Sequence, residues 1–296
     1  MKIGIIGLSV NNGHPYSFSA ILNGYDKVYF RQSGWDVILN YLEKQKKSSF
    51  GISNAKVTHA WTQNFEITKQ LCKACYIKNA CNDYNEMLSE IDALIIARDD
   101  WKSHFKIAYP FLKKGIPVFI DKPLTLDEDE LNSFLPYLKT NKLMSCSGFR
   151  YSKELDHIRN EKKYINSIKI IHGAVVNDFF KYGIHLLEAI SGVGFSFKNC
   201  KIEKLSSKIE TYLINLENDT SVVLSCLGRS AKIFNLNIYS KNEHIEINLN
   251  DNFTAFKRTL FEFIKMVKNK DTKIDPNETV NLIKVLINCK KISENL

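Results

Sequence analysis

The feature that most constrains the fold is the regular alternation of short apolar strands and helices over the first half of the chain. Lys2–Ile6 is predicted to be a strand that ends at Gly7, and the later segments Asp92–Ala97 and Pro117–Ile120 are apolar almost throughout. Strands that lack a polar face are buried on both sides, and intervening helices connect parallel neighbours. The sequence therefore predicts an α/β fold with a doubly wound, Rossmann-type parallel sheet.

The second half of the chain has a different pattern. Beyond about residue 150, apolar and polar residues alternate, as in Ser167–Val176, which is typical of strands covered on one face only. Two helices are predicted near the end of the chain, at Phe253–Lys268 and Asn277–Ile292. We therefore expect two domains: a Rossmann domain over residues 1–123, and an α+β domain with a largely antiparallel open sheet over residues 124–296.

Composition excludes several classes of protein. Of the 296 residues, 44% are hydrophobic and 25% charged, which excludes a disordered, collagen-like or coiled-coil chain. No apolar run approaches the roughly 20 residues that span a bilayer. The net charge is +9, but the lysines are interspersed with acids and form no basic stripe. We expect a cytoplasmic protein that binds neither membranes nor nucleic acid, and whose charge suits a phosphate-bearing ligand.

The cysteines favour a core role over a metal or disulfide role. Their number, seven, is odd, so a complete disulfide framework is impossible. Cys72, Cys75 and Cys81 form the only cluster in the sequence, and no second Cys/His pair follows at the spacing of a closed zinc site. Cys72 and Cys75 fall three residues apart in a predicted helix, where thiols pack as small apolar groups. We expect no metal.

The first place to look for a ligand is the loop after the first strand, because ligands of doubly wound sheets bind beyond the carboxyl ends of the strands. The loop contains Gly7-x-Ser9-x-x-Asn12-Gly13 and is followed by His14. A glycine-rich turn there lets backbone amides and a helix N-terminus approach a pyrophosphate. Ser9 replaces one such glycine, whereas Asn12 and Gly13 can take a positive φ. An ordinary strand-to-helix turn is the alternative.

The end of the second strand bears on the choice of dinucleotide. Lys56–Trp61 is followed by Thr62 and Gln63, where NAD enzymes tend to place a carboxylate that holds the ribose hydroxyls. The missing carboxylate makes a 2′-phosphate permissible, but no nearby arginine argues for one, so NAD and NADP both stay open.

Residues 25–55 are predicted to be an irregular insertion.

Four segments occur in the order and spacing of one family's motifs. Leu112–Leu124 ends in Asp-Lys-Pro-Leu and is similar to the motif G-K-H-V-x-x-E-K-P at the end of a fifth strand. Ala93–His104, Ser147–Tyr151 and Gly183–Leu187 resemble A-V-x-I-A-T-P-N-x-x-H, V-G-F-x-R-R and D-x-G-x-H-x-x-D. Together they resemble the glucose–fructose oxidoreductase, inositol 2-dehydrogenase and rhizopine-catabolism (Gfo/Idh/MocA) family. The resemblance implies an NAD(P)-dependent oxidoreductase that transfers a hydride to or from a hydroxyl carbon of a sugar, an inositol or a nucleotide sugar.

The resemblance also implies roles for individual residues. Lys122 is expected to contact the substrate hydroxyl and the nicotinamide ribose, and His185 is the second acid/base candidate. Arg150 and Tyr151 are expected to hold an anionic or sugar group, or else to hydrogen-bond between the domains. Lys181 stands where the family has an aspartate, and is expected to bind substrate or to act on its neighbours by charge. The alternative is a lysine that only extends into solvent. The residues expected to contact the cofactor are Gly7, Ser9, Asn12, Gly13, His14, Thr62, Gln63, Arg98, Trp101, His104 and Asp121.

Two further expectations concern catalysis and assembly. The altered loop and Lys181 also suit a protein that binds the cofactor without catalysis, as a sensor or regulatory partner, and this alternative stays open. Family members often pair through the second sheet, so we expect a homo-oligomer, a dimer or a tetramer, formed through the C-terminal sheet.

Overall fold

The computed structural model describes the chain except for residues 162–164, 166, 207, 232, 242 and 295–296. The chain forms two units, which are described separately. The first comprises Met1–Leu124, Ser133–Ser145 and Leu260–Lys273, and the second comprises Thr125–Asn132, Cys146–Thr259 and Ile274–Leu296. The expected division after residue 123 did not include the two later segments of the first unit. All of the residues that the structure does not describe fall within the expected second domain, residues 124–296.

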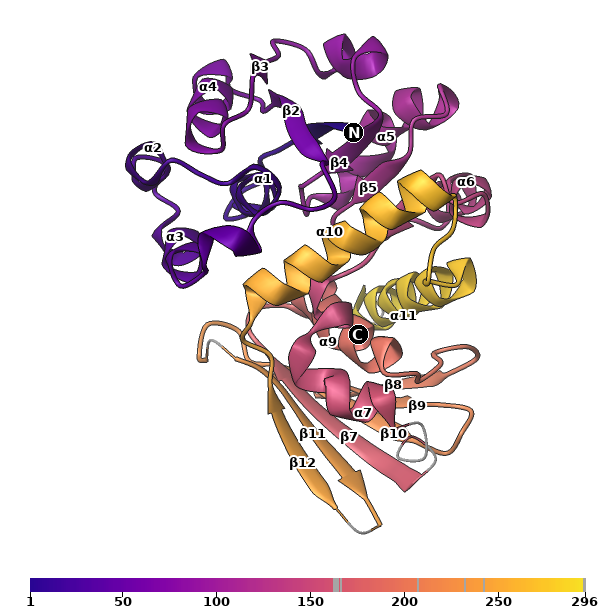
Figure 1. Cartoon of the computed structure of the whole chain (residues 1–296). Helices are drawn as coiled ribbons and strands as arrows, with labels where there is room; N and C mark the ends of the chain where they lie inside the picture. The colour runs from indigo at the N-terminus through magenta and orange to yellow at the C-terminus, as the bar shows by residue number, and fades with distance from the viewer. Residues whose placement is uncertain (162–164, 166, 207, 232, 242, 295–296) are drawn as a thin grey trace. The chain divides into compact units, whose positions relative to one another are not determined.

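The first unit is built on a six-stranded parallel sheet in the order β3-β2-β1-β4-β5-β6 (Figure 1). This order, with the turning point between β1 and β4, is the doubly wound arrangement predicted from the sequence. Ile3, Ile5 and Ile6 of β1 are completely buried, as expected of a strand covered on both faces. The elements are β1 (Lys2–Ile6), α1 (His14–Asn23), α2 (Lys27–Arg31), α3 (Asp36–Glu43), β2 (Lys56–Trp61), α4 (Phe65–Ala74), β3 (Asn79–Ala80), β4 (Ala93–Ile96), α5 (His104–Lys113), β5 (Val118–Ile120) and β6 (Leu143–Ser145).

The segment 25–55 corrects a prediction. It is not irregular, because it forms the two short helices α2 and α3. Asp26 begins α2 by accepting hydrogen bonds from the backbone amides of Val28 and Tyr29, and the buried ring of Phe30 packs edge-on against Tyr16 of α1 at 5.6 Å. Helices this short span too few turns for an apolar period to be visible in the sequence.

The second unit contains a six-stranded mixed sheet in the order β12-β11-β7-β10-β9-β8. Only β7 and β10 pair in parallel, and the other four pairs are antiparallel, so the predicted largely antiparallel sheet is confirmed. The elements of this unit are α7 (Asp156–Asn160), β7 (Ile168–Val175), α9 (Ile184–Gly192), β8 (Lys201–Ser206), β9 (Glu210–Asn215), β10 (Ser221–Cys226), β11 (Phe234–Ser240), β12 (His244–Asn248) and α11 (Pro276–Glu294). Two helices contain residues of both units, namely α6 (Glu128–Lys139) and α10 (Asn252–Asn269).

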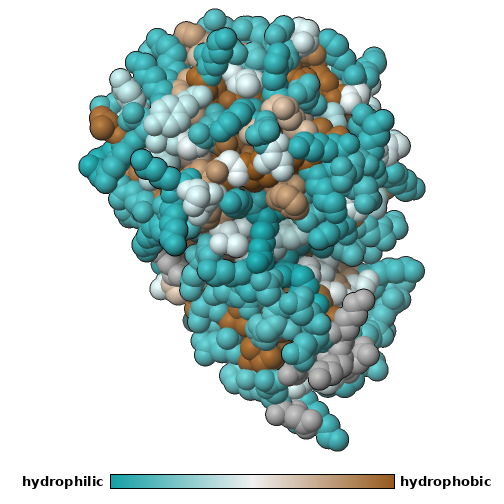
Figure 2. Space-filling model, viewed as in Figure 1, coloured by the Kyte–Doolittle hydropathy of each residue, from teal (hydrophilic) through white to brown (hydrophobic). Residues whose placement is uncertain are grey.

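The surface and the cysteines agree with an ordinary packed protein. Among the described residues, no helix is both long and apolar enough to cross a membrane, and the face shown in Figure 2 is largely hydrophilic with scattered apolar side chains. All seven cysteines are free and six of them are buried. Burial, with a contribution from Cys81, raises the pKa of the Cys72 thiol to about 12, so that it stays protonated at neutral pH. The described residues contain no group of three or more His, Cys, Asp or Glu side chains placed to hold a metal ion.

Candidate functional site

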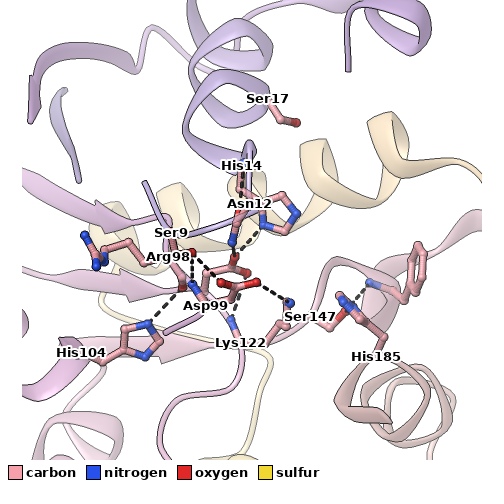
Figure 3. Close-up of polar contacts among 12 residues, drawn as sticks. Ser9, Asn12, His14, Ser17, Arg98, Asp99, His104, Lys122, Ser147 and His185 are labelled. Carbon is pink, nitrogen blue, oxygen red and sulfur yellow. Dashed lines mark hydrogen bonds and ion pairs between the residues drawn. The ribbon is translucent and has the colours of Figure 1, made fainter. Parts of the chain in front are cut away.

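The candidate site of the first unit lies at the carboxyl ends of β1, β4 and β5, beside the point where the strand order turns. In an open α/β sheet this is where ligands bind. Each strand is followed by polar residues: Ser9 and Asn12 after β1, Asp99 after β4, and Asp121 and Lys122 after β5. Figure 3 shows Ser9, Asp99 and Lys122 pointing toward one another.

Lys122 is held in the protein interior beside a carboxylate. Its residue is only 3% exposed, and its Nζ lies 3.9 Å from Oδ2 of Asp99, whose side chain is equally buried. Asp99 is in turn fixed by Ser9, which donates from Oγ to Oδ1 of Asp99 at 2.5 Å and accepts from the Asp99 backbone amide at 3.2 Å. A buried ammonium needs such a partner, because an isolated charge in the interior is costly.

Asp99 was not predicted to be a site residue. Sequence comparison with the family motif marks it only as a departure, since the family has proline at this place. Its position three residues beyond a buried strand, at the edge where ligands bind, is the signal that would have identified it.

A second buried carboxylate, Asp121, lies next to Lys122 in the chain. Its Oδ2 lies 2.6 Å from Nδ1 of His14 and accepts from Nδ2 of Asn12 at 3.3 Å, while Oδ1 accepts from the Lys122 amide at 3.0 Å. Burial alone would raise the pKa of Asp121, but the charge and hydrogen bond of His14, with Lys122, outweigh burial and lower the pKa well below its usual value. Asp121 is therefore an ionised acceptor inside the unit.

The loop after β1 folds as a four-residue turn rather than as an open glycine cradle. The Asn12 amide donates to the Ser9 carbonyl at 3.1 Å, and Asn11 takes the left-handed conformation with φ of 62°. Gly13 can take a positive φ but has φ of −93° here, and the left-handed residue of the turn is Asn11, one position before Asn12. The side chain of Asn12 accepts from the His14 amide at 2.8 Å.

Both glycines of this loop are needed for close packing. A Cβ on Gly7 would lie 2.1 Å from Cγ of Pro15, and a Cβ on Gly13 would lie 2.6 Å from the ring of Trp35. The first distance reflects the tight passage from β1 into α1, and the second the packing of the loop against the segment 25–55. Gly7 therefore keeps the role that a first glycine has in dinucleotide loops.

The other residues predicted to contact the cofactor are tied into the framework of the unit. The Gln63 amide group donates to the Leu8 carbonyl at 2.6 Å and accepts from the Leu8 amide at 3.0 Å. The Thr62 hydroxyl donates to the Asn64 carbonyl at 2.7 Å. The two Gln63 bonds fasten the loop after β1 to the residues after β2. Thr62 is buried, whereas Gln63 is exposed.

The segment after β4 carries the remaining three of these residues. The Arg98 guanidinium makes a two-pronged contact with the Asp100 carboxylate at 2.8 and 2.6 Å. His104 is completely buried, with Nδ1 and Nε2 each 3.0 Å from a backbone carbonyl, those of Leu124 and Arg98. Burial lowers the pKa of His104, so it acts as a packed framework residue. Trp101 is partly exposed, and the ammonium of Lys102 lies 5.6 Å from the centre of its ring.

In the second unit, His185 stands in the first turn of α9 and is buried. Its Nδ1 lies 2.6 Å from the Ser147 hydroxyl, and the rings of Phe149 and Phe234 are each 5.4 Å from its own ring. Lys181 is partly buried in a single π-helical turn, Phe179–Gly183, that precedes α9. Asp178 caps this turn by accepting from the Lys181 amide at 2.8 Å. The local fold thus fixes the orientation of the His185 ring.

Arg150 is engaged in a buried network within the second unit, and its expected contact with substrate stays a prediction. Nε donates to Glu188 at 2.6 Å, Nη1 to Glu278 at 2.8 Å and Nη2 to the Ser191 hydroxyl at 3.0 Å. Every nitrogen of the guanidinium therefore has a protein partner. The neighbouring Tyr151 accepts at its backbone carbonyl from Arg258 at 3.2 Å, and its contact with substrate stays a prediction.

The pairing of His14 with Asp121 gives a test by stability. The folded-state pKa of Asp121 is below its ordinary value of 3.8, so Asp121 contributes stability that is present above about pH 4 and is lost as the pH falls through the folded-state pKa. The substitution His14→Ala raises this pKa and is expected to lower the free energy of unfolding by about 2 kcal/mol near pH 6. Urea denaturation at a series of pH values measures the difference, which should shrink progressively as the pH falls below about 4.

The exposed His157 of α7 provides the matched control, since His157→Ala removes an imidazole from the surface. Its effect on the free energy of unfolding should stay within about 0.5 kcal/mol. A His14→Ala variant as stable as the natural chain at pH 6 would contradict the pairing.

Part of the chain matches a known protein family. Residues 33–149 match the family model described as an oxidoreductase family with an NAD-binding Rossmann fold. No curated protein matches the chain. The whole chain has solved structural neighbours of low sequence identity, each of which supports the fold alone.

Three of these neighbours illustrate the likeness. The scyllo-inositol dehydrogenase of Lactobacillus casei, crystallised with NAD(H) and scyllo-inositol, has a TM-score of 0.72 at 16% identity, covering 98% of this chain and 96% of its own. The myo-inositol 2-dehydrogenase of Lactobacillus plantarum has a TM-score of 0.75 at 14% identity, with coverage of 98% and 96%. The UDP-N-acetylglucosamine 3-dehydrogenase of Acidithiobacillus ferrooxidans has a TM-score of 0.71 at 13% identity, with coverage of 98% and 97%.

The residues at the carboxyl ends of the strands of the first sheet have the chemistry that a bound dinucleotide needs. The strand order turns between β1 and β4, which is where a crevice opens in such sheets. Gly7 retains the close strand-to-helix passage, and the buried Asp121 and Lys122 offer an acceptor and a donor for ribose hydroxyls. The family model confirms the expected cofactor class, NAD or NADP. Residues 33–149 thus match an oxidoreductase family with an NAD-binding Rossmann fold, the Gfo/Idh/MocA family that the sequence motifs also resemble.

Proposed function

We propose that the chain is an NAD(P)-dependent dehydrogenase that transfers a hydride between the nicotinamide and a hydroxyl-bearing carbon of a sugar, an inositol or a nucleotide sugar. The observation that carries this proposal is the buried amine of Lys122, held beside Asp99 at the carboxyl end of β5. The structural neighbours act, by their names, on inositols and a nucleotide sugar, which supports the same class of substrate.

Oxidation of a secondary alcohol releases a hydride and a proton, so the site needs an acceptor for each. When bound, the nicotinamide supplies the hydride chemistry. Lys122 exchanges the proton with the substrate hydroxyl through Nζ, and Asp99 positions this amine, being itself fixed by Ser9. The ionised Asp121 accepts a hydrogen bond from a ribose hydroxyl while His14 and Asn12 keep it in place.

His185 is the second acid/base group in this proposal. Its contact with the Ser147 hydroxyl and the surrounding aromatic rings fix the imidazole at one orientation. Lys181, in the turn before α9, takes the place of the family's aspartate, and we propose that it binds an anionic group of the substrate. A phosphate of a nucleotide sugar would satisfy this charge.

The proposal is tested by turnover of a panel of inositols, sugars and nucleotide sugars with NAD⁺ and NADP⁺, followed by the absorbance of the reduced nicotinamide. We expect at least one compound to be oxidised, with one reduced cofactor formed per product. Dinucleotide binding is measured in parallel by nicotinamide fluorescence. Binding without turnover of any compound would instead indicate a cofactor-binding sensor, and absence of binding would contradict the proposal as a whole.

A further inference from the structure

A cavity of about 390 Å³ opens on the surface between α2 and α4, the helix that follows β2. We name it the β2-end pocket and define it by Tyr29, Asn64, Glu66, Lys69, Gln70 and Lys73. The acid/base chemistry proposed above makes no use of it. All of these residues belong to the first unit.

The β2-end pocket begins at Asn64, close after the second strand of the sheet. In dinucleotide folds the residues that follow the second strand read the 2′ position of the adenosine ribose. Here β2 ends at Trp61, and Asn64, three residues later, lines the pocket and caps α4. Gln63 lies between them in the chain, and its side-chain amide both donates to and accepts from the backbone of Leu8 in the loop after β1. Tyr16, in the first turn of α1, donates to Gln70 of the pocket at 3.4 Å.

The pocket carries positive charge in a defined arrangement. Lys69 and Lys73 are four residues apart on α4, so their side chains extend from the same face of the helix. The Lys73 ammonium lies 5.7 Å from the centre of the Tyr29 ring, and the Lys69 ammonium lies 2.6 Å from the Glu66 carboxylate. With two lysines and one glutamate, the lining residues have a formal charge of +1.

We propose that the β2-end pocket binds the 2′-phosphate of NADP through Lys69 and Lys73, and that NADP is therefore the preferred cofactor. This inference rests on the proposed function. A carboxylate after β2 would hold the ribose hydroxyls of NAD and repel this phosphate, and the chain has Thr62 and Gln63 there instead. The phosphate, a dianion, competes with the exposed Glu66 carboxylate for the Lys69 ammonium.

The test is the binding of NADPH and NADH to the full chain, followed by nicotinamide fluorescence and therefore independent of turnover. We expect NADPH to bind at least about tenfold more tightly than NADH. Lys69→Gln and Lys73→Gln should each weaken NADPH binding by about fivefold, and the effect on NADH should stay within about twofold. Glu66→Gln should strengthen NADPH binding, because it removes the competing carboxylate. Added salt should weaken NADPH binding more than NADH binding.

The matched control is Lys78→Gln, which removes an exposed lysine of the same unit that lines a different cavity, near β3. It should change neither affinity by more than about twofold. Equal affinities for NADPH and NADH, or a loss in the Lys69 and Lys73 variants that is the same for both, overturns the NADP assignment and leaves the proposed dehydrogenase intact. Binding of neither dinucleotide overturns both.

Discussion

Substitution of Lys122 by alanine is expected to lower kcat/KM by about 10²–10⁴-fold, the range typical of a lost general acid or base. The amine of Lys122 is the buried group that we propose exchanges the substrate proton. The loss should fall on kcat, because the proton moves in the transition state and the contact adds little to ground-state binding. Steady-state kinetics on the substrate identified by the panel measures it.

Two controls separate chemistry from folding in this experiment. Lys122→Ala leaves Asp99 buried without its ammonium partner, so the unfolding transition and the dinucleotide affinity of the variant must be recorded beside its rate. Small primary amines added to this variant should restore part of kcat, which a misfolded site would not allow. Lys114→Ala, at an exposed lysine after α5, should keep full activity. Full activity of Lys122→Ala itself would show that another group exchanges the proton.

Substitution of Arg150 by methionine is expected to give the largest loss of stability, about 3–5 kcal/mol in the free energy of unfolding. Arg150 holds Glu188, which is 3% exposed, through a 2.6 Å contact, and it also binds Glu278 and Ser191. Burial alone would lower the pKa of Arg150, but Glu188 and Glu278 raise it further above its ordinary value. The substitution thus leaves the Glu188 carboxylate buried and uncompensated.

A double variant makes the interpretation specific. Arg150→Met with Glu188→Leu replaces the buried pair by apolar side chains, and should recover most of the stability lost by Arg150→Met alone. Urea denaturation of the two single variants and the double variant gives the coupling energy. An Arg150→Met variant of unchanged stability with a raised KM for substrate would instead support the substrate-binding role expected from the sequence.

The family motifs identified the proposed proton-exchanging residue, Lys122, because these motifs lie where strands end. Lys122 follows the buried strand β5 by two residues, and a strand that is apolar throughout can be recognised in the sequence by composition alone. The carboxyl ends of parallel strands share one edge of the sheet, so the polar residues that follow them come together whatever their separation in the chain. Asn12 and Asp121 meet in this way across 109 residues.

Partners of buried charges could not be predicted in the same way. Arg150 precedes Glu278 by 128 residues, and no sequence pattern links an arginine in a 3-10 turn to a glutamate in the first turn of α11. The family motif marks Asp99 only as a residue that differs from the expected proline, and says nothing of its contact with Lys122. The two short helices α2 and α3 were missed because a five-residue and an eight-residue helix contain too little periodicity.

Local pattern determined the two-part α/β organisation of this protein and the parallel pairing of its first sheet, because alternation of strands and helices is written in consecutive residues. The motif at the end of the fifth strand located Lys122. Only the tertiary structure decided which charge each buried side chain meets: Asp99 for Lys122, His14 for Asp121, and Glu188 for Arg150. Those pairings join residues from separate strands, turns and helices. Their energy depends on burial and on distances of a few ångströms, which exist only once the chain has packed.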